Sequence, residues 1–183
     1  MNNNELGMHF VCTHEEAKTL IEKNDTFWIA DCGCRKEHNG CKRSRVDVCL
    51  GFREGTTSTD SGLRQASRAD ALALLKEAQD KKLVTRPFRS KDRTEVVGIC
   101  FCCDCCCGYV VDPEQDEYVC DKGDYIEDTD LDSCTLCGDC VDVCYFKART
   151  MVDDRLVISR QKCYGCGLCS YVCPESVIKM WKR

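Results

Sequence analysis

The sequence lacks long hydrophobic runs and a secretory leader. Asp, Lys or Arg interrupts every apolar stretch before it reaches the roughly 18 residues that a membrane-spanning helix needs. The N-terminal residues show no basic segment followed by an apolar core and a small-residue cleavage site. We therefore expect a soluble cytoplasmic protein without a membrane span. In such a reducing compartment thiols stay free to bind metals.

Basic residues are scarce in the most acidic part of the chain. The formal net charge is −5, and between residues 112 and 132 ten Asp or Glu residues stand against Lys122 alone. This charge argues against nucleic acid as a partner. The acidic segment is either a solvated linker or a docking surface for a basic protein. The sequence also lacks an acid–base constellation, so we do not expect the isolated chain to be an enzyme.

Cysteine, in contrast, is abundant, with 20 in 183 residues. This exceeds the level of roughly 8–10% at which composition indicates a disulfide scaffold or a metal protein. The length fits two compact modules, each of which needs more than apolar burial to stay folded. Because disulfides are rare in a reducing compartment, we expect metal centres.

The first half of the chain contains three recognisable elements. Thr13 and Glu16 form the capping box of a short helix. Ser67 precedes a second helix, whose apolar residues recur at helical spacing. Residues 94–101 are apolar and β-branched enough for a buried strand. Residues 32–49 are rich in glycine, asparagine and charge, so we expect a loop there.

The last third of the chain contains an internal repeat of cysteines. Adding 29 to the residue number maps the first run onto the second and also maps Met151 onto Met180. Both runs have the spacing Cys-x2-Cys-x2-Cys-x3-Cys, which bacterial proteins use to bind iron–sulfur clusters. The first run is Cys134, Cys137, Cys140 and Cys144, and the second run is Cys163, Cys166, Cys169 and Cys173.

The spacing predicts two 4Fe-4S clusters with exchanged fourth ligands. Two intervening residues let a tight loop wrap three thiolates around one cluster, with Gly138, Gly165 and Gly167 available for unusual backbone conformations. The fourth cysteine begins a helix that leads away, so Cys173 completes the first triplet and Cys144 completes the second. Zinc commonly uses two CxxC pairs separated by a longer loop, which this pattern does not match.

With these motifs, residues 125–183 resemble a clostridial-type two-cluster ferredoxin, including the 18 residues between Cys144 and Cys163. The resemblance implies a small α+β fold with strands at residues 125–128, 148–152, 156–158 and 177–181. It also implies a low cluster potential. One departure concerns Tyr145, which stands where the family usually has proline after the fourth cysteine.

The ten thiols at residues 32–49 and 100–107 indicate an additional metal centre. We expect a third iron–sulfur cluster or one zinc ion; thiol chemistry or metal delivery is the remaining alternative. The histidines at positions 9, 14 and 38 are expected at the surface, although His38 lies close enough in sequence to Cys34 to act as a ligand. The candidate ligands are Cys34, Cys41, Cys49, Cys102, Cys103 and Cys106.

The first half also resembles an N-terminal domain found on some dicluster ferredoxin proteins of anaerobes. The resemblance rests on a CxCR motif at Cys32, Cys34 and Arg35, on two more cysteines and a helix, and on the CxCCxCCC run at residues 100–107. It implies redox work in anaerobic metabolism.

Together these patterns predict an α+β protein with three parts. We expect a small mixed α/β cysteine-rich module at residues 1–111, an acidic linker at residues 112–124 and a ferredoxin-like module at residues 125–183. The predicted function is transfer of single electrons to or from a partner oxidoreductase. The alternative is a redox-sensing, metal-delivery or assembly protein that uses the N-terminal cysteines.

Overall fold

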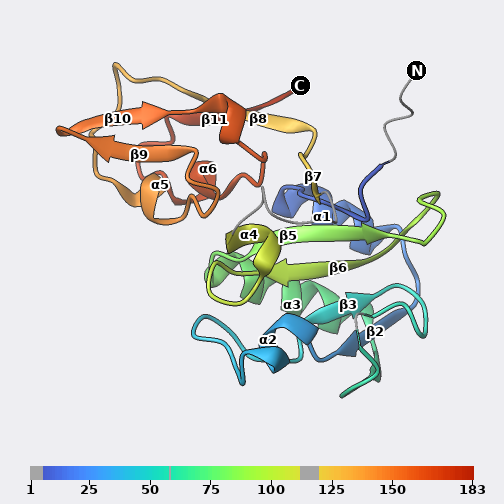
Figure 1. Ribbon diagram of the computed structural model, residues 1–183. Coiled ribbons are helices and arrows are strands. Elements are labelled where there is room, and N and C mark those ends of the chain that lie inside the picture. The colour runs from blue at the N-terminus through green and yellow to red at the C-terminus, as the bar shows by residue number, and fades with distance from the viewer. Residues whose placement is uncertain (1–5, 58, 112–119) are drawn as a thin grey trace, which may run out of the picture.

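The computed structural model describes residues 6–57, 59–111 and 120–183. It is a mixed α/β structure in which one large sheet is followed by two small hairpin-like sheets (Figure 1). The α+β class predicted from the sequence is confirmed to the extent that helices and strands occur together, whereas the arrangement in two modules stays a prediction. None of the helices in the described ranges is long and apolar enough to cross a membrane.

The large sheet has seven strands in the order β4-β2-β3-β6-β5-β1-β7. Its neighbours are antiparallel except for β1 and β7, which run parallel. The predicted strand at residues 94–101 is confirmed as β6, shifted by one or two residues. The strands are β1 (His9–Phe10), β2 (Phe27–Ala30), β3 (Cys49–Gly51), β4 (Arg64–Ala66), β5 (Val84–Arg89), β6 (Val96–Cys102) and β7 (Cys120–Asp121).

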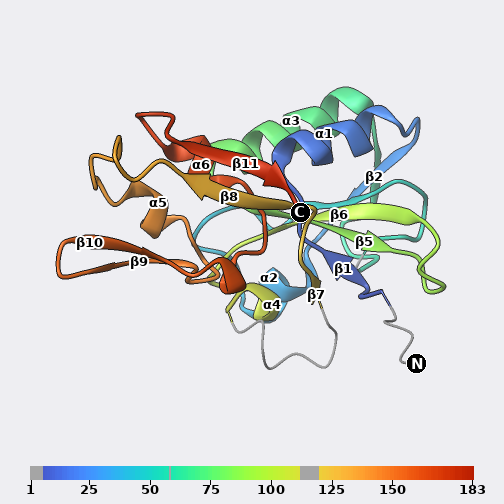
Figure 2. The same ribbon diagram turned by 90° about the horizontal axis from the view of Figure 1, so that it is seen from above.

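Helices α1 (His14–Glu22) and α3 (Arg68–Asp80) cover one face of this sheet (Figure 2). Both begin with a capping box, so the two predicted helices are confirmed. Their apolar faces bury a core against Leu50, Ile99 and Phe101 of the sheet. The prediction that His14 lies at the surface is wrong, because it is 4% exposed and its Nε2 lies 2.9 Å from the carbonyl oxygen of Leu83.

Two short helices, α2 (Gly33–Glu37) and α4 (Gly108–Val111), lie on the other side of the sheet (Figure 2). The prediction that residues 32–49 form only a loop is therefore wrong, since this segment contains α2 and enters β3 at its end. The carbonyl of Cys32 accepts the first helical hydrogen bond, from the N–H of Lys36. The buried Arg35 side chain then fixes the helix by donating to the carbonyls of Arg45 and Phe101.

The C-terminal part consists of two strand pairs and two short helices. The predicted strands are confirmed, each boundary within one residue. Gly165 in the second run has φ +80°, and a Cβ there would lie 2.2 Å from the carbonyl oxygen of Tyr125. The elements are β8 (Tyr125–Thr129) paired with β11 (Ile178–Lys182), β9 (Arg149–Val152) paired with β10 (Arg155–Ile158), α5 (Asp139–Asp142), the 3-10 helix η1 (Arg160–Lys162) and α6 (Leu168–Val172).

The chain enters the C-terminal part through the large sheet. Most of the acidic linker predicted at residues 112–124, namely residues 112–119, lies outside the described residues. Cys120 and Asp121 form β7 beside β1, and the Gly123 N–H donates to the carbonyl of Tyr164. The predicted division into three parts stays a prediction.

Candidate iron–sulfur and metal centres

The first cysteine run and the last cysteine of the second run line one pocket. Cys134, Cys137 and Cys140 enter it from the loop before α5 and from α5 itself, and Cys173 enters at the end of α6. Gly138 has φ +88° at the N-cap of α5, a left-handed conformation that glycine adopts without strain. The rest of the lining is mostly apolar and includes Leu136, Leu156, Met151, Pro174 and Ile178.

The second pocket has the reciprocal composition. It is lined by the triplet of the second run, Cys163, Cys166 and Cys169, together with Cys144 from the first run. Apolar groups again fill most of the remaining wall, among them Phe146, Ala148 and Met180. Each pocket therefore joins three cysteines of one run to the fourth cysteine of the other.

The residues present fit an iron–sulfur cluster in both pockets. Four soft thiol ligands in an apolar wall suit iron–sulfur clusters and offer little to hard cations such as magnesium. Burial raises the pKa of the Cys169 thiol to about 12, against the opposing Arg149 guanidinium, so positive metal ions are needed to hold it as a thiolate. The pockets thus have the donor set that cluster binding requires.

A buried arginine lies among the C-terminal cysteines. Arg149 of β9 is 1% exposed, and its Nη1 donates to the sulfur of Cys140 at 3.3 Å. Its Nη2 donates to a carboxylate oxygen of Glu127 at 2.5 Å and to the hydroxyl of Thr129. Its Nε has no hydrogen-bond partner among the described residues. The positive charge of Arg149 therefore lies next to Cys140 of the first pocket. Arg149 and Glu127 are also part of the lining of the second pocket.

Comparison with known families agrees with this geometry. Residues 126–174 match the family model described as a 4Fe-4S dicluster domain. No curated protein is significantly similar to the chain. The C-terminal part is thus a 4Fe-4S ferredoxin-type domain, a class of domain that works in iron–sulfur electron transfer.

Tyr145, which directly follows Cys144, joins the C-terminal part to the large sheet. Its ring is 5% exposed and packs in a buried cluster with Val84 of β5. Its hydroxyl donates to the carbonyl oxygen of Lys82 at 2.9 Å, and the Arg43 guanidinium lies 4.8 Å from the ring centre. Burial raises the pKa of Tyr145 to about 12, although the Arg43 charge opposes it, so the hydroxyl stays a donor.

We expect Tyr145→Phe to lower the thermal midpoint of the anaerobic protein by about 2–4 °C. The change leaves the Lys82 carbonyl without its donor, which costs about 1 kcal/mol. Differential scanning calorimetry measures the shift. Tyr171→Phe is a matched control, because the Tyr171 ring is 46% exposed. Equal midpoints for Tyr145→Phe and the unchanged protein would contradict an anchoring role of the hydroxyl.

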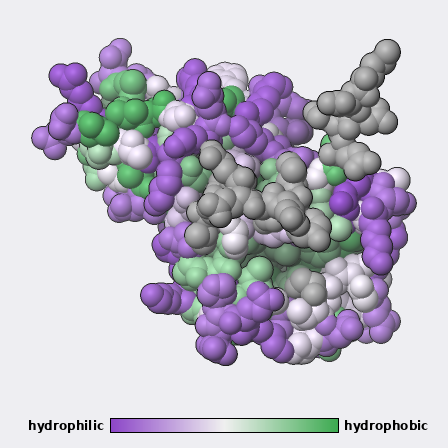
Figure 3. Space-filling view, in the orientation of Figure 1, coloured by the Kyte–Doolittle hydropathy of each residue, from purple (hydrophilic) through white to green (hydrophobic). Residues whose placement is uncertain are grey.

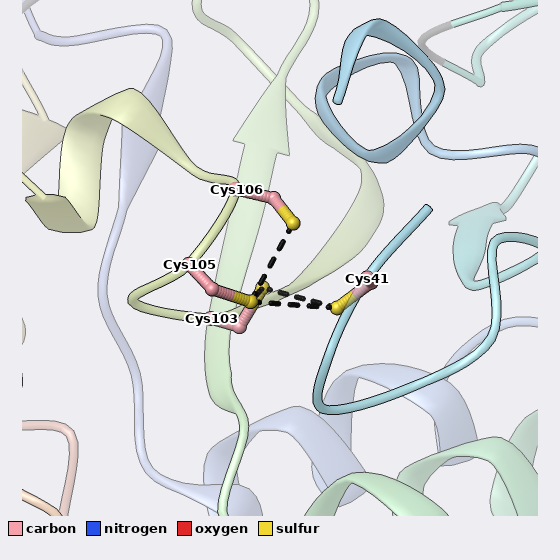
Figure 4. Close-up of side chains that lie close together, drawn as sticks. All are labelled: Cys41, Cys103, Cys105 and Cys106. Carbon is pink, nitrogen blue, oxygen red and sulfur yellow. Dashed lines mark hydrogen bonds between the residues drawn. The ribbon is translucent and has the colours of Figure 1, made fainter. Parts of the chain in front are cut away.

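Four other cysteines converge above the end of β6 (Figure 4). The sulfur of Cys41 lies 3.6 Å from that of Cys103 and 3.7 Å from that of Cys105. The sulfur of Cys105 lies 3.5 Å from those of both Cys103 and Cys106. All four sulfurs lie within 4.8 Å of one another. We name these residues the tetrathiolate group.

Local contacts hold the two segments of the tetrathiolate group together. The Arg43 guanidinium forms a bidentate ion pair with Asp104, with one bond of 2.8 Å, and so ties the Cys41 loop to the turn at residues 103–106. Burial raises the pKa of Cys41, but hydrogen bonds from the N–H groups of Arg43 and Ser44 and the Arg35 charge outweigh it and bring this pKa down to about 7. The Cys41 thiol is therefore about half ionised near neutral pH.

The structure divides the six cysteines predicted for the N-terminal centre. It brings Cys41, Cys103 and Cys106 together and adds Cys105, which the sequence prediction omitted. Cys34, Cys49 and Cys102 lie outside this group: Cys34 and Cys102 line a neighbouring cavity, to whose wall Cys103 and Cys106 also contribute, and Cys49 lies in β3 opposite Cys100 of β6. His38 is exposed, and its Nδ1 lies 2.8 Å from the carbonyl oxygen of Cys34.

Proposed function

We propose that this protein passes single electrons to or from a partner oxidoreductase through two 4Fe-4S clusters, as a carrier or as a redox subunit. The observation that carries the proposal is the pair of C-terminal pockets, each lined by four cysteines from both runs. A 4Fe-4S cluster, when bound, supplies a centre that gains or loses one electron with little change in geometry.

The ligands follow from the composition of the two pockets. Cys134, Cys137, Cys140 and Cys173 would hold one cluster, and Cys163, Cys166, Cys169 and Cys144 the other. Because each pocket takes ligands from both runs, ligation would also crosslink the two halves of the domain. The apolar walls limit the access of water to the sulfur ligands, and the Arg149 guanidinium supplies positive charge that favours the reduced state.

The partner would dock beside the first pocket. Cys137 is exposed, and Leu136, which lines the same pocket, is 44% exposed. Near β9 and β10, Figure 3 shows hydrophobic side chains gathered on the surface, and Val152 and Val157 of these strands are 51% and 47% exposed. Exposed apolar residues next to a redox centre form a contact through which an electron can pass to another protein.

A reductive titration of the anaerobic full-length protein tests this function. We expect the iron–sulfur absorbance to bleach as the C-terminal centres take up about one electron each, with a paramagnetic signal of the reduced clusters. The same changes must reverse on oxidation. A protein that carries iron in the C-terminal part but accepts no electrons at any potential reached by dithionite would contradict an electron-transfer role.

We further propose that the tetrathiolate group binds one zinc ion. A tetrahedral ion with metal–sulfur bonds of about 2.3 Å separates its ligand sulfurs by about 3.8 Å, close to the spacing between these thiols. Four thiolates with no open position are typical of a structural zinc site. The site would join the loop at Cys41 to the turn at residues 103–106.

We expect Cys105→Ala to remove about one zinc per chain and to leave iron and sulfide unchanged, because three thiols no longer close the coordination shell. Metal analysis of the anaerobically purified full-length protein measures this. Cys12→Ala is the matched control: Cys12 is 1% exposed and lies in the core under α1. Loss of several irons together with sulfide in Cys105→Ala would instead indicate a polynuclear cluster in this group.

A further inference from the structure

A second group of cysteines lies on the face of the sheet opposite α1 and α3. Side chains alternate along a strand, so Cys100 and Cys102 of β6 project away from the core that contains Ile99 and Phe101. The strand register sets Arg86 of β5 opposite Cys100. The start of α2 and the residue before α4 bring three more thiols to this face, Cys32, Cys34 and Cys107.

Four of these thiols form a chain of neighbours along the wall of a cavity, whose lining also includes Cys100, Cys103 and Cys106. The thiol of Cys34 neighbours those of Cys32 and Cys107, and the thiol of Cys102 neighbours that of Cys107. We name these four residues the Arg86 group. The cavity has a volume of about 220 Å³, compared with about 20 Å³ in each of the two C-terminal pockets. It therefore has room for a ligand as large as the one proposed there.

The spacing of the Arg86 group differs from that of the tetrathiolate group. Among the residues that the structure describes, only the tetrathiolate group has three or more ligand atoms all within 4.8 Å of one another. The sulfurs of the Arg86 group do not all lie this close together, and neither do those of the two C-terminal cysteine sets. A single tetrahedral ion draws its thiolates close together, whereas the four thiolates of a 4Fe-4S cluster each bind a different iron and lie farther apart. The wider spacing favours a cluster.

Arg86 is an independent indication of a negatively charged ligand. Its side chain is 2% exposed, and its Nη1 donates to the sulfurs of Cys102 at 3.6 Å and Cys107 at 3.2 Å. Its Nε donates to the sulfur of Cys120 at 3.4 Å. Its Nη2 is buried and has no hydrogen-bond partner in the described part of the chain, and its guanidinium lines the cavity.

The charge of Arg86 has to be balanced inside the protein. The titratable groups that act on it most strongly are the surrounding thiols. A buried guanidinium is costly unless negative charge accompanies it, and neutral thiols do not provide that charge. Thiolates bound to a metal cluster do.

We propose that the Arg86 group binds an iron–sulfur cluster of more than one iron through Cys32, Cys34, Cys102 and Cys107. The site lies against the ferredoxin-type domain, because Cys102 and Cys107 share a buried cluster with Tyr145, Phe146 and Leu168, against which Cys166 also packs. The binding site itself does not depend on the electron-transfer role proposed above.

The test is iron, sulfide and zinc analysis of the full-length chain, reconstituted without oxygen with ferrous iron and sulfide. We expect about two to four irons, with equal sulfide, beyond the roughly eight irons of the ferredoxin-type domain. The double variant Cys34→Ala/Cys102→Ala should lose this excess and keep about one zinc at the tetrathiolate group, which reports that the N-terminal part is folded. Cys12→Ala should lose neither.

Two results would overturn the proposal. One is an unchanged protein that holds only the iron of the ferredoxin-type domain, a result that does not depend on the folding of any variant. The other is a folded double variant that retains all its iron and sulfide. Failure of the ferredoxin assignment gives a distinguishable outcome, in which the unchanged protein holds only about two to four irons and the double variant loses them.

Discussion

Cys144→Ala is expected to remove the cluster of the second triplet, although Cys144 belongs to the first run. The alanine leaves the pocket of Cys163, Cys166 and Cys169 with three thiols, so that about four irons and four sulfides are lost or one iron leaves to give a three-iron cluster. The electron paramagnetic resonance signal of the remaining intact cluster should persist. Iron analysis and spin quantification of the anaerobic variant measure both effects.

Cys173→Ala is the reciprocal variant and should damage the cluster of the first triplet instead. To assign each loss, the two variants are compared with Cys137→Ala and Cys166→Ala, which remove one ligand from each triplet. Cys144→Ala should give the same spectrum as Cys166→Ala, and Cys173→Ala the same as Cys137→Ala. If Cys144→Ala instead gave the same spectrum as Cys137→Ala, each run would bind its own cluster. That result would falsify the exchange of the fourth ligands.

The second large effect concerns the buried Arg149. Replacing it by methionine should lower the potential of the cluster bound at Cys140 by roughly 100 mV, the effect of one unit charge about 7 Å from the cluster at an effective dielectric constant of about 20. The potential falls because the reduced cluster carries one more negative charge, which the guanidinium stabilises. Protein film voltammetry of the full-length chain measures the change.

Two control variants separate this charge effect from damage to the fold. Arg149→Met alone leaves the Glu127 carboxylate buried at 2% exposure with only the Arg160 guanidinium, 3.4 Å away, as an ion-pair partner, which is destabilising. The double variant Arg149→Met/Glu127→Gln removes that carboxylate charge. Arg149→Lys keeps the positive charge and should move the potential much less than Arg149→Met does. Equal potentials in Arg149→Met and the unchanged protein would contradict the electrostatic role.

The C-terminal part was the most predictable region, because its signals are local. Cysteine spacing sets the loop around each triplet, and the repeat carries the same pattern into the second half. Four strands were predicted to within one residue. The buried ion pair of Arg149 and Glu127 was not predicted, because nothing in the spacing of charged residues distinguishes these two from the exposed charges around them.

The N-terminal cysteines were harder to assign because their contacts are distant in sequence. Cys41 meets Cys103 and Cys105 across 62 and 64 residues. The run at residues 100–107 also changes conformation within a few residues, from β6 through a turn at residues 104–106 towards α4. Adjacent cysteines therefore face different groups. Neither strand alternation nor helical spacing divides Cys103, Cys105 and Cys106 from Cys102 and Cys107, and only the tertiary structure reveals the two groups.

The structure gives a physical reason for the presence of Tyr145. The sequence alone shows only that the proline expected after Cys144 is absent. In the structure its ring fills the contact between the ferredoxin-type domain and the large sheet, and its hydroxyl donates across that contact. Proline at this position could supply neither the ring nor the donor.

The central claim is that eight cysteines hold two clusters with exchanged fourth ligands. Anomalous diffraction at the iron absorption edge, from crystals of the full-length protein grown without oxygen, tests it most directly. The claim predicts two iron clusters, one bonded to Cys134, Cys137, Cys140 and Cys173 and the other to Cys163, Cys166, Cys169 and Cys144. Iron bonded to all four cysteines of a single run, or an absence of iron from both pockets, would contradict it.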